Sequence, residues 1–295
     1  MRLRSVYGSP NNVALYLGRV LPIAVAVGVF RVSGFEFRVS SFKSLVSSLQ
    51  SLSVRNTQHA TRPWFYLAAA FPMLLAFLLT FSKGGILLGL PAAFLVLFVI
   101  WQRRAGRRTW PWLVGLAVVG VIGLLVAMQI PALAGRLNPQ ITGFFRLYLW
   151  QASLEMIREH PWLGVGLDNF LYAYRGRYIL NAAWQEPNLN HPHNLVLDFA
   201  TRLGLLGLMA GGWLFWQLGQ KVRAAISEPP SSRNTEFWPV AVGIAGSLAY
   251  MLAHGLVDHG YFLVDLAFAF HLLLALAQTN PSSWVRSDRF SGPTA

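Results

Sequence analysis

The amino-acid sequence predicts an all-α, polytopic integral membrane protein with about seven transmembrane helices and one large extracytoplasmic helical loop domain. Its 295 residues are 55% hydrophobic and only 12% charged, whereas soluble domains carry about 25% charged residues. The apolar residues form runs close to the ~20 residues that a membrane-spanning helix needs. The basic residues gather mostly in short segments between these runs, the pattern typical of positive-inside topology.

Each predicted span is an apolar run flanked by polar or aromatic residues. The spans are expected at residues 13–30, 64–81, 85–101, 110–130, 195–217, 237–253 and 261–278. The first has the weakest pattern, because Arg19 and Pro22 interrupt it. Glycine and proline within the other runs are compatible with spans, since membrane helices contain both more often than soluble helices do.

The segment 102–109 orients the spans. It reads QRRAGRRT, with four arginines and no acidic residue, which predicts a cytoplasmic loop that also contacts anionic lipids. Alternation of the spans then puts 131–194 and the turn at 82–85 outside. It also puts the N-terminus outside despite Arg2 and Arg4, which an odd number of preceding helices would explain.

The expected division of the chain follows from this topology. It consists of an N-terminal anchor helix and cytoplasmic loop (1–63), transmembrane helices (64–130), an extracytoplasmic loop domain (131–194), further transmembrane helices (195–278) and a cytoplasmic tail (279–295). The loop domain is too long for a plain connector, since structureless loops beyond about 15 residues are usually functional or disordered. Apolar residues at Phe145, Leu149, Ala152 and Met156 predict a helix at 142–159.

Several functional classes are excluded by composition. The chain has no cysteine, so it has no disulfide, thiolate metal site or cysteine nucleophile. The net charge of +13 is accounted for by membrane topology, because the sequence has neither a basic recognition helix nor an aromatic RNA-binding motif. We therefore expect membrane lipids, and no nucleic acid, among its partners.

Two histidines lie where the outer loop meets the 195–217 span, in the segment NHPHN at 190–194. A histidine there, with an ordinary pKa of about 6.5, can act as a general base, and Asn194 could orient it or a substrate hydroxyl. The alternative is a loop histidine that only hydrogen-bonds the backbone. Zinc held by His191 and His193 is disfavoured, because a catalytic site needs three protein ligands and no third has a convincing spacing.

Four motifs resemble the O-antigen ligase superfamily, which includes O-antigen ligases, O-antigen polymerases and protein O-oligosaccharyltransferases. His193 and Asn194, followed after nine residues by the glycines of 204–207, are similar to its H-N-x9-G-x-x-G signature. The other three segments are FSKGG at 81–85, RLYLW at 146–150 and HPWLGVG at 160–166. The resemblance covers about residues 64–278, and the order of the motifs matches.

The resemblance implies a membrane-bound, metal-independent glycosyltransferase without a cofactor, in the bacterial inner (plasma) membrane, with its active site on the extracytoplasmic face. A lipid-linked oligosaccharide on polyprenyl (undecaprenyl) diphosphate is the implied donor, and a hydroxyl of a glycan, lipid or protein the acceptor. His193 is the expected catalytic base, and Arg146, Lys83 and Arg136 are expected to bind the diphosphate. Lys83 replaces the family's usual arginine, so a bidentate contact becomes a point charge. For Arg146 an ordinary salt bridge is the alternative.

Two ionisable residues near the outer end of the 237–253 span complete the candidate site. His254 and Asp258 are four apart and share a face if the helix continues, and ionisable residues at membrane depth are functional candidates. We expect a supporting role, such as orienting the base, for both of them and for Asn194 and His191. A hydrogen-bonded helix cap is the alternative.

Other functions remain open from the sequence. An O-antigen or exopolysaccharide polymerase would use the same chemistry with another repeat unit as acceptor. A non-enzymatic transporter or assembly subunit would use arginine and histidine to line a path, although the paired, interrupted half-repeats of many transporters are not evident. Superfamily members usually have more spans, so the chain is expected to correspond to their C-terminal part.

Overall fold

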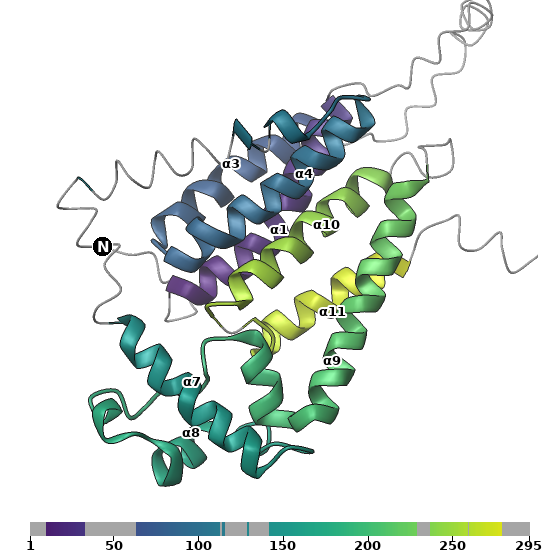
Figure 1. The fold of residues 1–295 in the computed structure, drawn as a ribbon. Helices are drawn as coiled ribbons and strands as arrows, with labels where there is room; N and C mark the ends of the chain where they lie inside the picture. Colours follow the sequence, from purple (N-terminus) through teal and green to yellow (C-terminus); the bar gives the residue numbers. More distant parts are fainter. Residues whose placement is uncertain are drawn as a thin grey trace, which may run out of the picture.

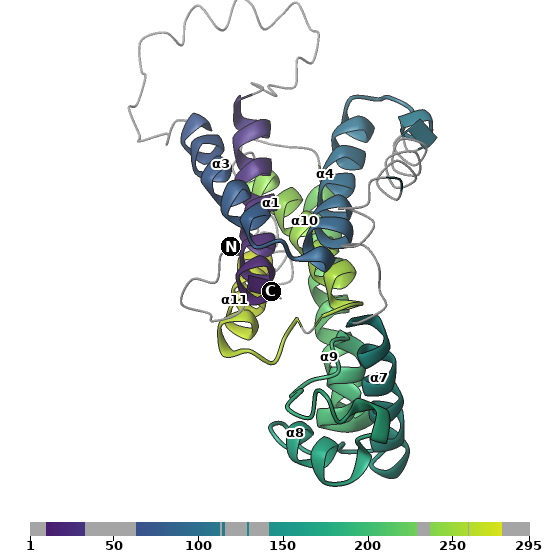
Figure 2. The ribbon, with the colours of Figure 1, turned by 90° about the vertical axis from the view of Figure 1, so that its left-hand side faces the viewer.

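The computed structural model describes residues 10–32, 63–112, 114–115, 129, 142–228, 237–258 and 260–278. Within these ranges the chain forms helices and turns and no β-strand, as predicted. Figures 1 and 2 show a bundle of long helices and a smaller helical domain beyond one end of it. The long helix α9 (Leu195–Ser227) runs from the smaller domain into the bundle.

The bundle is built from apolar helices that coincide with predicted spans. With α9 they are α1 (Pro10–Val32), α3 (Pro63–Leu79), the π-helical turn η3 (Gly85–Gly89) with α4 (Leu90–Arg104), α10 (Phe237–Gly255) and α11 (Val264–Gln278). Among the described residues, four helical stretches are long and apolar enough to cross a membrane: Pro10–Phe30, Gly85–Arg104, Leu195–Ser227 and Phe237–Gly255. Two apolar helices, Trp64–Leu79 and Val264–Gln278, are shorter. The predicted span at 110–130 lies mostly outside the described residues.

Helix α1 had the weakest sequence pattern, yet it packs closely against α10 and α3. A Cβ on Gly18 would lie 2.0 Å from Cζ of Tyr250, so the two helices touch through a glycine. Arg19 is only 1% exposed and donates to the backbone carbonyls of Gly260 and Leu266. Two nitrogens of the charged group that interrupts the apolar run are therefore hydrogen-bonded inside the protein, where a buried charge needs partners.

The helices alternate in direction between two ends of the bundle. Tyr250 near the end of α10 donates to the carbonyl of Ala14 near the start of α1, at 2.8 Å. Phe30 near the end of α1 meets Trp238 near the start of α10 edge to face. This antiparallel pairing matches the predicted alternation of spans across a membrane.

At each end of the bundle lie the segments that the predicted topology assigns to one side of the membrane. The histidine end consists of the turn at 82–84, residues 190–195 and residues 254–258. The arginine end consists of residues 102–105 and 223–228 with the start of α10, where Arg104 donates to the carbonyls of Ile226 and Glu228 at 3.3 and 3.0 Å. The side of the membrane that each end faces stays a prediction.

The smaller domain lies beyond the histidine end (Figure 2). It comprises α7 (Thr142–Glu159), α8 (Phe170–Ala173), the π-helical turn η4 (Tyr174–Tyr178) and the 3-10 turn η5 (Asn181–Ala183). Leu149 and Met156 of α7 are buried in one cluster with Phe170 and Tyr174. The apolar spacing that predicted this helix is therefore its packing face.

Helix α9 bends sharply at Gly204, whose φ of 66° and ψ of −165° are not helical. The bend frees backbone groups, and the motif at 160–166 binds them. The amide of Val165 donates to the carbonyl of Thr201 at 2.8 Å, and the amide of Leu205 donates to the carbonyl of Pro161 at 2.7 Å. Two of the four sequence motifs thus form one packed unit that holds the start of α9.

Candidate active site

The start of α9 is fixed against the end of α10 by Asn194. Its side-chain oxygen accepts from the amides of Val196 and Leu197, both at 3.0 Å, which makes it the N-cap of α9. Its side-chain nitrogen donates to the carbonyl of Leu256 at 3.1 Å. Asn194 therefore supports the site as a helix cap that positions its neighbour His193.

His193 projects from this cap toward a carboxylate in the turn that follows α10. Its φ of 51° lies in the left-handed region, which few residues other than glycine adopt. Its Nδ1 lies 2.9 Å from Oδ1 of Asp258, whose side chain is only 3% exposed. On the other side of His193, the indole of Trp150 donates to the carbonyl of Pro192 at 2.8 Å. The base candidate is thus held from α7, α9 and the end of α10.

The contacts around the two histidines favour one arrangement of their protons. Nδ1 of His191 lies 2.5 Å from Oδ1 of Asn190, an acceptor, so it carries the proton and leaves a lone pair on Nε2. Burial lowers the pKa of His191 although the nearby Asp258 carboxylate opposes the shift, so this ring is neutral near pH 7. In this arrangement Nδ1 of His193 carries a proton that faces two acceptors, Oδ1 of Asp258 at 2.9 Å and Nε2 of His191 at 3.2 Å, and its Nε2 is left as an acceptor.

His254 lies beneath these residues and is only 1% exposed. Its Nδ1 is 2.8 Å from the hydroxyl of Tyr250, while its Nε2 is 3.9 Å from Oδ2 of Asp258. The longer distance exceeds a hydrogen bond. Two residues near the end of the 237–253 span were expected to support the base. Asp258 contacts His193, whereas His254 contacts Tyr250.

Lys83 is exposed at the start of the helical segment that continues into η3, at this same end of the bundle. The next residue, Gly84, packs on the site, because a Cβ there would lie 2.8 Å from Cδ2 of His254. Among the described residues Lys83 forms no ion pair. It therefore brings an uncompensated positive charge to the edge of the histidine end.

Arg146 lies on α7 one helical turn before Trp150, so the two residues share a face. Its charge is close enough to His254 to interact with it. Within the described ranges Arg146 has no acidic partner, so the salt bridge that was its alternative explanation is not found there. Arg136, the third predicted diphosphate ligand, lies outside the described residues.

Asp198 and Arg202 form a buried ion pair that sequence reasoning missed. Nε of Arg202 donates to Oδ1 of Asp198 at 2.7 Å, and its guanidinium also donates to the carbonyls of Asn190, at 2.9 Å, and Leu167. These bonds attach two parts of the outer loop to α9. The available signal was a pair of opposite charges four residues apart within a predicted span.

Asp258 also corrects the sequence argument about metals. That argument found no third ligand beside His191 and His193, but the fold supplies one 65 residues away along the chain. The ligand atoms of His191, His193 and Asp258, which we call the histidine cluster, lie within 4.8 Å of one another. Two histidines and a carboxylate are a donor set that catalytic zinc accepts, so the residues present fit a divalent ion.

Residues 68–210 match the protein family described as O-Antigen ligase. The matched segment contains six of the eight predicted site residues, and the other two, His254 and Asp258, lie beyond it. No curated protein matches the sequence. The resemblance of the four motifs is thereby confirmed, because the segment 68–210 that contains them is similar to the O-antigen ligase family.

Proposed function

We propose that this protein is an O-antigen ligase-like glycosyltransferase with His193 as its general base. The donor is a glycan on polyprenyl (undecaprenyl) diphosphate, and the acceptor is a hydroxyl of a glycan, lipid or protein. The observation that carries the proposal is the 2.9 Å contact between Nδ1 of His193 and the buried carboxylate of Asp258. It orients the ring and stabilises the imidazolium that forms when Nε2 accepts a proton, as in other carboxylate–histidine pairs.

The proposed reaction needs one base and a few cations. Nε2 of His193 takes the proton of the acceptor hydroxyl while that oxygen forms a bond to the anomeric carbon. The bond from this carbon to the diphosphate oxygen breaks, and polyprenyl diphosphate leaves with the electron pair, so the anomeric configuration inverts. Arg146 and Lys83 stabilise the charge that develops on the leaving group. Positioned charges of this kind contribute on the order of 10²–10³ in rate each.

The proposed location is the bacterial inner membrane, with the histidine end on the extracytoplasmic face. Two facts support this assignment. The arginine-rich segment 102–109 lies at the opposite end, where positive-inside topology favours the cytoplasm. The similarity of residues 68–210 to the O-antigen ligase family supports a lipid-linked glycan in the membrane as the donor.

The test is transfer of a lipid-linked glycan by purified full-length protein and its variants. His193→Ala should reduce kcat by about 10²–10⁴, the usual contribution of a general base, and His191→Ala should reduce it less. Asp258→Asn should lower kcat more than it raises KM, since the carboxylate acts through the base. Full transfer by a well-folded His193→Ala variant would rule out this mechanism.

A metal-dependent transferase is the second candidate, and the histidine cluster is the observation that favours it. We propose the metal-free mechanism, because the diphosphate is already a good leaving group and the two cations can neutralise it. Activity should therefore survive dialysis against a chelator, with less than stoichiometric metal remaining by elemental analysis. Activity that is lost on chelation and restored by a divalent ion would establish the second candidate instead.

A further inference from the structure

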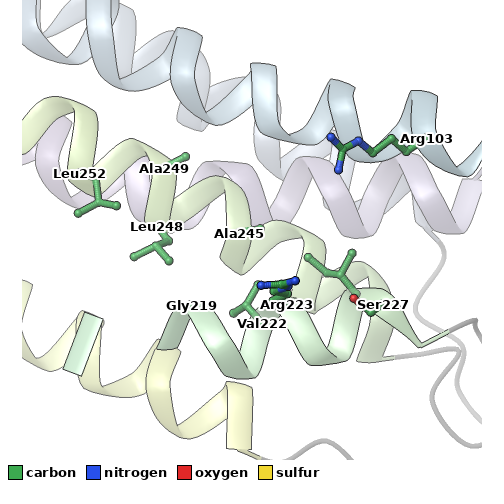
Figure 3. A pocket seen from close by; sticks show the side chains of 10 residues that line it. Arg103, Gly219, Val222, Arg223, Ser227, Ala245, Leu248, Ala249 and Leu252 are labelled. Carbon is green, nitrogen blue, oxygen red and sulfur yellow. The ribbon is translucent and has the colours of Figure 1, made fainter. Parts of the chain in front are cut away.

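A cavity of about 580 Å³ lies between α4, α9 and α10, away from the histidine cluster (Figure 3). Its polar part is formed by Arg103 of α4 and Arg223 of α9, which belong to the arginine end. Its apolar part follows α10 from Ala245 to Leu252. At 1.5 Å per residue, that wall extends about 10 Å along the helix, so the cavity is charged at one end and apolar along its length.

The two arginines of this cavity have no acidic partner among the residues that the structure describes. They come from different helices and both line the same space (Figure 3). Neither Arg103 nor Arg223 forms an ion pair within the described ranges, and no acidic residue is among those that line the cavity. Two cations that share one space without an acidic partner favour an anion between them, most of all at a membrane surface.

The apolar part has the size and shape of a chain-binding groove. Three small residues, Gly219 of α9 and Ala245 and Ala249 of α10, leave space between the two helices. Leu248 supplies apolar surface. Leu252 is 47% exposed on a helix that is apolar enough to span a membrane. The volume falls within the range of about 300–1,000 Å³ that is usual for small-molecule sites. Free phosphate would leave this apolar wall without a partner.

We propose that the cavity binds one anionic phospholipid from the membrane leaflet at the arginine end. The phosphate lies between Arg103 and Arg223, and an acyl chain follows α10 from Ala245 toward Leu252. Phosphatidylglycerol has the required chemistry, with a net negative headgroup and two acyl chains. Phosphatidylcholine has the same chains without net charge, so it is the matched comparison lipid.

The test measures lipid retention by the full-length protein from mixed micelles of phosphatidylglycerol and phosphatidylcholine, by native mass spectrometry. The wild type should retain one phosphatidylglycerol in preference to phosphatidylcholine. Each basic residue near an anionic surface contributes about fivefold in affinity, so Arg103→Gln with Arg223→Gln should reduce the preference by about 25-fold. Arg107→Gln with Arg108→Gln removes the same charge from residues that do not line the cavity and should preserve it.

A second variant tests the apolar wall without changing charge. Ala249→Phe should displace the lipid, whereas glycerol 3-phosphate, which lacks acyl chains, should not compete with it in the wild type. Melting temperature and size-exclusion profile show whether each variant is folded. Equal retention of the two lipids, equal loss in both arginine pairs, or full competition by glycerol 3-phosphate would each overturn the proposal.

Discussion

His193 shows how much backbone constraint the candidate base needs. A non-glycine residue with φ of 51° is strained by about 1–3 kcal/mol, and such strain persists only where the neighbours impose it. Trp150 holds Pro192 on one side, and the capping bonds of Asn194 hold the other. The left-handed turn directs the imidazole to Asp258, so the strain serves the geometry of the site.

The diphosphate ligands give the prediction at this scale. Arg146→Ala should lower turnover by about 10²–10³ and weaken donor binding, because it removes a cation beside the site. Lys83→Arg should be tolerated, since it keeps the charge and restores a bidentate donor. Steady-state kinetics with a lipid-linked donor would measure both effects.

A control for this comparison lies on the same helix. Arg158 is 80% exposed at the far end of α7 and pairs only loosely with Glu155, at 3.6 Å, so Arg158→Ala should leave kinetics unchanged. If Arg146→Ala and Lys83→Arg both matched the wild type in turnover and donor affinity, the two cations would have structural roles instead.

The bend in α9 is the feature that positions the site at the scale of elements. If α9 were straight through Gly204, its backbone groups near residue 204 would bond within the helix. They would then not be free to bond the 160–166 segment while Asn194 caps the start of the helix. The bend instead brings residues 195–203 beside the end of α10, where Leu195 packs on Gly255. The glycine of the signature motif is thus explained by backbone geometry at the bend and not by contact with the histidine cluster.

Substitution at the bend gives the second prediction. At Gly204 the φ and ψ fall in a region essentially restricted to glycine, and a Cβ would lie 2.3 Å from the carbonyl group of Trp162. Gly204→Ala should therefore lower the melting temperature and reduce transfer. Gly212→Ala, on the same helix with nothing within 4 Å of the added Cβ, should preserve both or raise the stability, because alanine favours helix by about 1 kcal/mol. Similar melting temperatures for the two variants would show that the bend tolerates a side chain.

The two ends of the bundle differ in charge, and this difference supports the proposed orientation of the whole molecule in the membrane. The arginine end has the 102–109 segment, the proposed lipid cavity and the contact of Arg104 with Trp238, 4.6 Å from the guanidinium carbon to the ring centroid. The histidine end has the histidine cluster and the smaller domain. Substrate chemistry and lipid anchoring are therefore proposed for opposite faces of one membrane.

Topology gives the prediction for the whole molecule. The chain has no cysteine, so single cysteines can be introduced without removing any other. With a membrane-impermeant maleimide added outside intact cells, Gln185→Cys should be labelled and Ala105→Cys should be protected. Both positions are exposed in the structure, so protection reports the membrane rather than burial. The reverse pattern would invert the topology and place the histidine cluster in the cytoplasm.

Local patterns in the sequence determined the class of the protein and the position of most of its helices. A bilayer acts on each apolar run separately, because every span must satisfy its own backbone and exceed a minimum length. For that reason the spans around α4 and α10 and the helix α7 could be recognised from composition and spacing. The motif containing His193 was also local, and so the superfamily and the candidate base were found without the structure.

Only the tertiary structure decided which side chains meet. Asp258 lies 65 residues from His193, and no periodicity links residues in two segments so far apart along the chain. Arg19 weakened its span in the sequence, and the carbonyls that satisfy it lie at the other end of the chain. Side-chain pairing depends on how helices distant in sequence pack, whereas hydropathy is a property of each segment alone. The sequence offered both His254 and Asp258 as supporting residues, and packing decided that Asp258 contacts the candidate base and completes a possible metal ligand set.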